Sequence, residues 1–421
     1  MVYVLSASGR PLMPTERHGK VRRLLKEKKA EVVSRKPFAI RLLYETTEET
    51  QPVDLGVDAG SGKIGLSACA EKKEFYAAEV ELRRDVTDLL SARREFRRAR
   101  RGRKRRYRKP RFDNRVRSKR KGWLAPSVET KISAHEQAVA GVMKLLPATH
   151  IFVETASFDL QKIKAIENGE PIPEGADYQK GEQFGFWNVR EYVLFRDGHK
   201  CRLCGGKSKD PILNVHHLES RKTGGDSPGN LIVLCGSCHK ALHAGLAELP
   251  ESAKRTKSLR DAAFMGIMRR TLLKRLKEKY GDSFVSETYG YLTKNARIEN
   301  GLEKTHAVDA RCISGHPNAK PLDCVYVQRR VRRHNRSLHK AKVLKGGIRK
   351  ANQAPREVKG FRLYDEVRFE GRDCFIFGRR SSGYFDLKTL DGTRIHPSAN
   401  CGKLRLLCMA ETTLTERRKR G

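Results

Sequence analysis

The segment from Cys201 to His243 contains cysteines and histidines at spacings that are typical of metal binding. One Cys-x2-Cys pair begins it, and a second pair lies near its end. Four thiolates arranged in two such pairs are a common ligand set of a tetrahedral Zn²⁺ ion. The sequence therefore predicts a structural zinc site at Cys201, Cys204, Cys235 and Cys238.

Histidines lie between and after the two Cys pairs. A predicted strand ends in His216 and His217, a polar loop follows, and Asn230 begins a second strand. The second Cys pair then starts a helix on which His239 and His243 are one turn apart. Because successive strand residues point to opposite faces, His216 and His217 cannot both bind one metal ion. Phosphodiester hydrolysis needs a divalent ion at the scissile phosphate and a neutral imidazole as general base for water.

Three acidic residues far apart in the sequence each accompany an apolar segment. Asp58 and Glu154 end predicted strands, and Asp309 shares a helix face with His306. A carboxylate at the end of an apolar strand is costly unless it is paired or binds a metal ion. If the three acids converge, they can hold two Mg²⁺ ions about 3.5–4 Å apart for in-line attack on a phosphodiester.

Alternating and helical patterns predict the elements that must position these residues. Residues 1–50 read as a small unit of strands around a basic helix at 16–29, and residues 358–408 as strands and turns of the SH3 or OB kind. The elements nearest the candidate sites are predicted strands at 53–58, 64–70, 75–80, 150–155 and 284–292, and helices at 127–146, 258–280 and 304–314.

The charge of the chain points to a polyanionic partner. Lys and Arg number 88 against 49 Asp and Glu, a formal net charge of +39 over 421 residues. Residues 93–121 concentrate this charge, since 18 of these 29 residues are Lys or Arg. Self-repulsion disfavours a helix there in water, so we expect a helix or arm that folds on a phosphate backbone.

Composition excludes several classes of protein. At about 150 residues per domain the length predicts two or three domains. No stretch reaches the roughly 18 uncharged apolar residues of a membrane span, and Met1 to Leu5 lack the features of a secretory signal. Ten scattered or paired Cys in a long chain do not form a secreted disulfide framework, which predicts a reducing compartment.

The ββα unit with its His-Asn-His order resembles the HNH endonucleases. The resemblance implies that His217 is the general base, that His216 and His239 hold the catalytic metal ion, and that Asn230 ties the loop that poses His217. His243 would contact phosphate or support a metal ligand. The zinc ion would stabilise the fold of a unit that is too small to fold alone.

The order of the three acids resembles the RuvC/RNase H fold, and the whole arrangement resembles the IscB family. Pro11-Leu12-Met13-Pro14 matches the motif of that family's N-terminal domain, and residues 93–108 match its bridge helix. The chain lacks the large helical recognition lobe of the related CRISPR type II nucleases. In IscB that role falls to a long structured RNA, the omega RNA.

The resemblance implies a multidomain α/β protein. Its RNase H-like RuvC core is split in sequence, a ββα-metal HNH domain is inserted, and the C-terminal region is β-rich and SH3/OB-like. The implied parts are an N-terminal PLMP domain at 1–50, RuvC segments at 51–82, 122–160 and 246–325, the bridge helix and basic arm at 83–121, a linker at 161–184, the HNH domain at 185–245 and the C-terminal region at 326–421.

The expected function is RNA-guided cleavage of double-stranded DNA. By resemblance, the HNH site cuts the guide-paired strand and the RuvC site cuts the displaced strand. Mg²⁺ would bind at Asp58, Glu154 and Asp309 and at His216 and His239. Partners are an omega RNA and target DNA with a short adjacent motif, in a monomeric cytoplasmic ribonucleoprotein. Guide phosphates would bind Arg93, Arg94, Arg97, Arg98, Arg100 and Arg101.

Two other functions remain open at this stage. An HNH homing or restriction enzyme would read DNA without RNA, but it does not account for the second carboxylate set. A non-catalytic zinc-containing RNA-binding protein would tolerate replacement of His217 and Asp58. A co-purified RNA of defined length would favour RNA-guided cleavage over the first alternative. Metal-dependent cleavage would rule out the second.

Overall fold

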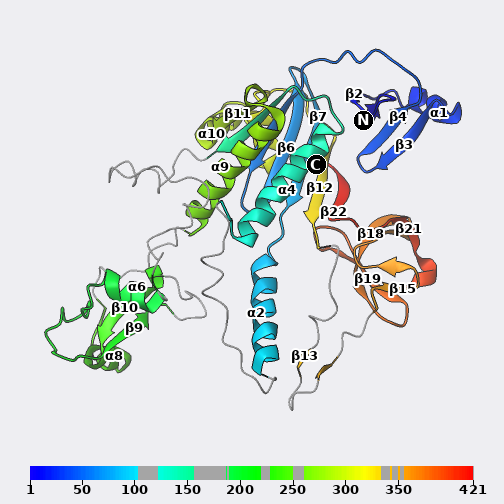
Figure 1. Cartoon of the computed structure of the whole chain (residues 1–421). Helices are drawn as coiled ribbons and strands as arrows, with labels where there is room; N and C mark the ends of the chain where they lie inside the picture. The colour runs from blue at the N-terminus through cyan, green and yellow to red at the C-terminus, as the bar shows by residue number, and fades with distance from the viewer. Residues whose placement is uncertain are drawn as a thin grey trace. The chain divides into compact units, whose positions relative to one another are not determined.

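A computed structural model describes residues 1–102, 122–155, 186, 189–219, 228–249, 260–332, 342–343, 349–350 and 355–420. The chain divides into two compact units, each considered by itself (Figure 1). The first contains the described residues of 1–120, 125–157 and 268–421, and the second those of 121–124 and 158–267.

The first unit begins with a four-stranded sheet in the order β2-β1-β4-β3. Val2, Val4, Val21 and Ile40 are among the buried side chains that join this sheet to its helix. The elements are β1 (Val2–Leu5), β2 (Pro11–Thr15), α1 (His18–Lys26), β3 (Ala30–Arg35) and β4 (Phe38–Leu42).

A seven-stranded sheet in the order β11-β8-β5-β6-β7-β12-β22 is the centre of the first unit. The strands β5, β6 and β7 are antiparallel neighbours, whereas β8 runs parallel to β5 and β11 parallel to β8. The strands are β5 (Asp54–Ala59), β6 (Lys63–Ala70), β7 (Lys73–Glu81), β8 (His150–Thr155), β11 (Val285–Tyr289), β12 (Cys324–Arg330) and β22 (Thr413–Lys419).

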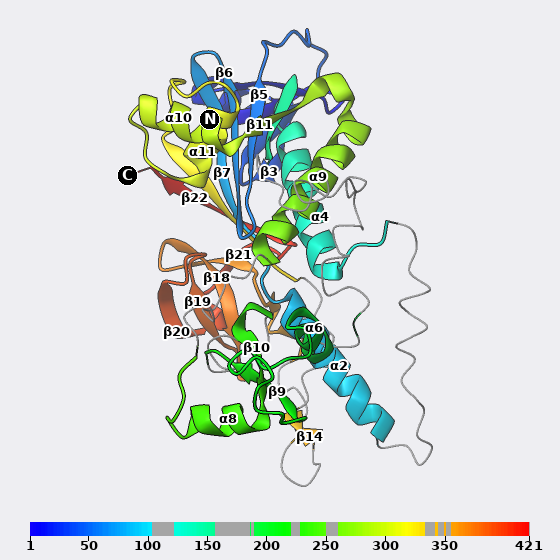
Figure 2. The same cartoon turned by 90° about the vertical axis from the view of Figure 1, so that its left-hand side faces the viewer.

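Helices cover both faces of this sheet, which explains the nearly continuous apolar runs of its central strands. Figure 2 shows α11 on one side of the strands and α4 and α9 on the other. The helices are α4 (Pro126–Met143), α9 (Arg260–Tyr280), α10 (Gly290–Glu299) and α11 (His306–Ile313). The basic helix α2 (Val86–Gly102) follows β7.

Glycines allow α11 to lie directly against β5 and β6. A Cβ atom built on Gly56 would lie 1.9 Å from the carbonyl oxygen of Ala310, and one on Gly65 would lie 1.9 Å from that of His306. No side chain fits in either place. These two glycines therefore set how close His306 and Asp309 come to the sheet.

The first unit also contains a five-stranded antiparallel sheet in the order β20-β19-β18-β17-β21. Its core includes Val367, Ile376, Phe385 and Leu387. The strands are β17 (Glu366–Phe369), β18 (Arg372–Arg379), β19 (Tyr384–Lys388), β20 (Arg394–Asn400) and β21 (Arg405–Cys408), within the predicted β-rich segment. Short pairs join β13 (Lys342–Val343) to β14 (Arg349–Lys350) and β15 (Glu357–Val358) to β16 (Phe361–Arg362).

The second unit contains a two-stranded antiparallel sheet flanked by helices. Tyr192 and Val193 of the first helix pack against Leu231 and Val233 of the sheet. The elements are α6 (Val189–Arg196), β9 (Leu213–His217), the short 3₁₀ helix η2 (Pro228–Asn230), β10 (Leu231–Cys235) and α8 (Gly236–His243).

The structure differs from the sequence-based expectations at two places. The strand predicted at 284–292 ends at Tyr289, because its partner β8 ends opposite, at Thr155, and the chain continues as α10. The strands β12 and β22 belong to the seven-stranded sheet, so the boundary expected between 325 and 326 falls inside β12. Parallel pairing of β12 with β7, more than 200 positions earlier, leaves no local signal in the sequence.

Two expectations concern residues that the structure describes only in part. Within the segment 83–121, expected to hold the bridge helix and the basic arm, α2 covers Val86–Gly102. Residues 103–121 and the linker at 161–184 lie outside the described residues. Among the described helices, none combines the length and the hydropathy that a membrane crossing requires.

Candidate nuclease sites

Three segments of the first unit bring together Asp58, Glu154, His306 and Asp309. The parallel pairing of β5 with β8 places Val57 opposite Val153, and Asp58 and Glu154 are the next residues on these strands. The helix α11, packed against β5 and β6 through Gly56 and Gly65, contributes the other two side chains. The predicted convergence of these residues is therefore present in the fold.

Each of the three carboxylates has a basic partner. The Nδ1 atom of His306 lies 2.5 Å from Oδ2 of Asp58, which is 7% exposed. Arg269 donates to Glu154 at 3.1 Å and to the carbonyl oxygen of Ala59 at 3.0 Å.

The third pair joins Arg297 to Asp309 at 3.1 Å. Sequence reasoning missed Arg269 of α9 and Arg297 of α10. A buried acid that needs a partner was the available signal for both.

The carboxylates also affect one another. Burial raises the pKa of Glu154, and the charge of Asp58 raises it further. Burial and then Asp58 raise the pKa of Asp309 in the same way. The hydrogen bond that His306 donates to Asp58 raises the pKa of His306. Such mutual repulsion is the electrostatic setting in which a divalent cation stabilises several carboxylates at once.

The donor chemistry of this site fits Mg²⁺, which prefers carboxylate oxygens. In the part of the chain that the structure describes, these acids do not form a set whose ligand atoms all lie within 4.8 Å of one another.

A buried histidine lies behind the carboxylates. His135 of α4 is fully buried, and its Nδ1 atom lies 2.8 Å from the carbonyl oxygen of Lys131. Within the described structure its Nε2 atom is buried without a hydrogen-bond partner. Burial lowers the pKa of His135 to about 4. The ring is therefore neutral at physiological pH.

The second unit brings three imidazoles together. Ring nitrogens of His216, His239 and His243 all lie within 4.8 Å of one another, and the Nε2 atoms of His239 and His243 are 3.3 Å apart. Burial lowers the pKa of His216, and the neighbouring imidazoles lower it further. Burial also lowers the pKa of His239. Neutral imidazole is the form that binds metal ions.

The role of His243 was left open by the sequence, and the structure includes it in this cluster. Three nitrogen donors suit a transition-metal ion such as Zn²⁺ or Ni²⁺, whereas Mg²⁺ prefers oxygen. The expectation of Mg²⁺ at His216 and His239 therefore fits the donor set poorly, because no carboxylate belongs to the cluster among the described residues.

His217 and Asn230 lie beside this cluster in different roles. His217 is adjacent to His216 on β9 and is not part of the cluster, in agreement with the alternation of strand side chains. Asn230 is fully buried, accepts a hydrogen bond from the Glu219 amide at 2.8 Å and donates to the Glu219 carbonyl at 3.0 Å. Asn230 thus holds the chain two residues after His217.

The four predicted cysteine ligands also converge. The Sγ atoms of Cys201, Cys204, Cys235 and Cys238 all lie within 4.8 Å of one another. Hydrogen bonding to Ser208 lowers the pKa of Cys204 to about 5, which favours the thiolate. A compact set of four sulfur atoms is compatible with a structural zinc ion.

The arginines expected to bind RNA lie on α2. Arg93 and Arg94 are exposed there, whereas the side chains of Arg97, Arg98, Arg100 and Arg101 lie outside the described residues.

Comparison with known proteins gives two family matches. Residues 2–181 match the RRXRR protein family, and residues 201–245 match the HNH endonuclease family. No curated protein matches the chain.

Solved structures of Cas9 show a weak similarity. Cas9 from Streptococcus thermophilus in complex with AGGA PAM is 17% identical with a TM-score of 0.30, over 46% of this chain and 26% of that chain. The type II-C Cas9 from Actinomyces naeslundii is 12% identical with a TM-score of 0.19, over 63% of this chain and 60% of that chain. The chain thus spans about a quarter of the length of the first of these proteins.

The HNH match, together with the histidine and cysteine clusters, defines the class: residues 201–245 are an HNH endonuclease domain. The RRXRR region that precedes this domain and the HNH domain itself are consistent with the IscB-like arrangement expected from the sequence.

Proposed function

We propose that this protein is an RNA-guided DNA endonuclease with two hydrolytic sites. One observation carries the proposal: the HNH domain is inserted between β8, which bears Glu154, and α11, which bears Asp309. One chain thus combines an HNH domain with a separate set of converging acids. A nuclease that cuts both strands of a duplex needs two such centres.

The topology of the large sheet supports an RNase H-like RuvC core. The strands β5, β6 and β7 are antiparallel neighbours. On the other side of β5, β8 pairs with it in parallel, and β11 pairs in parallel with β8. In this proposal the unit around β9, β10 and α8 is a ββα-metal fold, and the five-stranded sheet is an SH3/OB-like barrel that contacts RNA and the target-adjacent motif.

At the carboxylate site, Asp58, Glu154 and Asp309 would hold Mg²⁺. Bound Mg²⁺ would supply Lewis-acid stabilisation of the attacking and leaving oxygens. His306 is hydrogen-bonded to Asp58 through Nδ1, and this contact raises the pKa of His306 and favours its protonated form. Arg269 and Arg297 orient Glu154 and Asp309.

At the HNH site, His216, His239 and His243 would hold a divalent metal ion that polarises the scissile phosphate. His217, which lies outside the cluster, accepts a proton from the attacking water as general base. Asn230 fixes the backbone beyond His217 through its two hydrogen bonds to Glu219 and so orients the base.

The charge of the chain supports nucleic acid partners. A net charge of +39 and the arginines of α2 suit an omega RNA whose guide pairs with target DNA, in a monomeric cytoplasmic complex. The HNH site would cut the guide-paired strand, and the carboxylate site would cut the displaced strand.

The test is a strand-resolved cleavage assay with RNA that co-purifies with the protein. Asp58→Asn should abolish cutting of the displaced strand, and His217→Ala should abolish cutting of the guide-paired strand. Matched controls are Asp54→Asn, at the other end of β5, and His199→Asn, outside the histidine cluster. Cleavage of both strands by the His217→Ala variant at the normal rate, or full activity without RNA, would contradict the proposal.

A further inference from the structure

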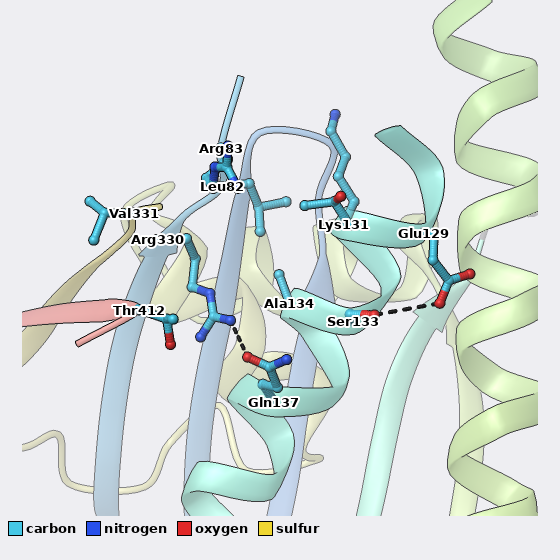
Figure 3. Close-up of a pocket in the computed structure, with 11 residues that line it drawn as sticks. Leu82, Arg83, Glu129, Lys131, Ser133, Ala134, Gln137, Arg330, Val331 and Thr412 are labelled. Atoms are coloured by element: carbon cyan, nitrogen blue, oxygen red, sulfur yellow. Dashed lines mark hydrogen bonds between the residues drawn. The ribbon is translucent and has the colours of Figure 1, made fainter. Parts of the chain in front are cut away.

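We propose that a cavity beside the start of α2 binds a phosphate-bearing nucleotide of a single nucleic acid strand. The cavity has a volume of about 290 Å³ and lies between α4, the ends of β7 and β12, and the chain before β22 (Figure 3). Arg83, Lys131 and Arg330 line it together with the apolar side chains of Leu82, Ala134 and Val331. This inference rests on nucleic acid binding alone and not on guided cleavage.

Arg330 is the central observation. Its half-buried guanidinium donates to Gln137 Oε1 and to Thr413 Oγ1, both of which are neutral. Among the described residues, no carboxylate forms an ion pair with it. Burial and the charge of Arg83 lower its pKa, so its environment disfavours an uncompensated cation. An anion bound in the cavity would relieve this cost.

The acidic groups near the cavity are already paired. Glu129 accepts two hydrogen bonds from Arg275, at 2.7 and 2.9 Å. Asp85 accepts two from Arg83, at 2.9 and 3.0 Å. The guanidinium of Arg330, whose two described acceptors are neutral, therefore gives the cavity a positive charge that favours an anionic ligand.

The walls and the position of the cavity indicate the chemical class of this anion. Apolar side chains opposite a guanidinium suit a sugar or base attached to a phosphate, and the Arg fork can give a phosphate two hydrogen bonds. Leu82 and Arg83 directly precede α2, the basic helix. A backbone that follows α2 can therefore continue into the cavity.

Photo-crosslinking to the full-length protein tests this. The probes are a single-stranded oligoribonucleotide with 4-thiouridine and an oligodeoxyribonucleotide with 4-thiothymidine. The expected result is a crosslink to α4 within residues 129–137, mapped by mass spectrometry. A crosslink to the RNA probe alone, to the DNA probe alone or to both identifies the source of the nucleotide, and each result supports the proposal.

Two variants separate binding from a structural role. Arg330→Gln should reduce the crosslink about tenfold, since a hydrogen bond to a charged group contributes about one order of magnitude in affinity. Gln137→Ala, which removes the same contact between α4 and β12 but keeps the charge, should retain the crosslink. If Arg330→Gln fails to fold, Lys131→Gln, which removes another charge from the cavity wall, must reduce the crosslink.

Three results would overturn the proposal. They are no crosslink within 129–137 in the unmodified protein, an unchanged crosslink in the folded Arg330→Gln variant, or equal losses of crosslink and of thermal stability in Arg330→Gln and Gln137→Ala. Because the probes carry no guide, the crosslinking result does not depend on whether the protein performs guided cleavage.

Discussion

At the scale of single residues, the two candidate sites differ in their donor atoms. The site of the first unit offers carboxylate oxygens, each held by a basic neighbour such as Arg269 or Arg297. Among the described residues, the metal-ligand cluster of histidines in the second unit offers imidazole nitrogens. Oxygen and nitrogen donors select different ions, so the two sites should differ in metal preference.

His243 should therefore act as a metal ligand. We expect His243→Ala to raise the metal concentration needed for half-maximal cutting by the HNH site about tenfold or more, with Ni²⁺ effective at lower concentration than Mg²⁺. The measurement is a metal titration of the cut in the guide-paired strand. Lys240→Ala, on the same helix but outside the cluster, is the control. An unchanged titration curve for His243→Ala would remove this residue from the ligand set.

His135 should make stability depend on pH. Its pKa is lowered to about 4 in the folded protein, against about 6.5 for an ordinary histidine. The unfolded chain then binds more protons between these values, so the free energy of unfolding falls as the pH falls through this window.

From pH 7 to pH 4.5 this residue should account for a loss on the order of 1–3 kcal/mol. His135→Gln, which is not ionisable, should show a weaker pH dependence by that amount in urea unfolding at several pH values. Equal pH dependence of the variant and the unmodified protein would be evidence against a buried neutral imidazole.

At the scale of elements, the approach of α11 to β5 and β6 decides the geometry of the carboxylate site. Gly65→Ala would push its Cβ against the carbonyl oxygen of His306 and displace α11. We expect a loss of about 1–3 kcal/mol of stability and a reduction of displaced-strand cutting, with guide-paired cutting retained. Thermal unfolding and strand-resolved cleavage measure both effects.

Gly141→Ala is the matched control. Gly141 is exposed on α4, and a Cβ atom there meets no atom within 4 Å. Because Ala is the better helix former, this variant should gain about 0.5–1 kcal/mol. If both variants changed stability and cleavage equally, the close approach of α11 would not be what positions the site.

At the scale of the whole molecule, a substitution in one unit should abolish the cut made by that unit and leave the other cut intact. The zinc ligands belong to the second unit, whereas the carboxylates belong to the first. Cys235→Ser should lower the zinc content well below one per chain and abolish guide-paired cutting, because the small unit has little core of its own. Displaced-strand cutting should persist.

Elemental analysis measures the zinc content, and strand-resolved cleavage measures the two cuts. The control is Cys408→Ser, because Cys408 is exposed. Full zinc content in the Cys235→Ser variant, or loss of both cuts together, would contradict a separate structural role for the zinc site.

The sequence by itself determined the local features of this protein. The two Cys-x2-Cys pairs identified four sulfur atoms that converge in the structure. The alternation of strand side chains separated His216 from His217, and only His216 lies in the cluster. Apolar periodicity located β5, β8 and α11 with their acidic residues. These features depend on spacings of a few residues, which the sequence records directly.

Only the tertiary structure decided which distant residues meet. Arg269 and Arg297 became partners of Glu154 and Asp309 through helix packing, and His243 joined His216 through the pairing of β9 and β10. The strands β12 and β22 joined the central sheet beside β7. Each of these contacts links segments separated by tens to hundreds of residues, and such contacts depend on the packing of the whole unit rather than on any local pattern.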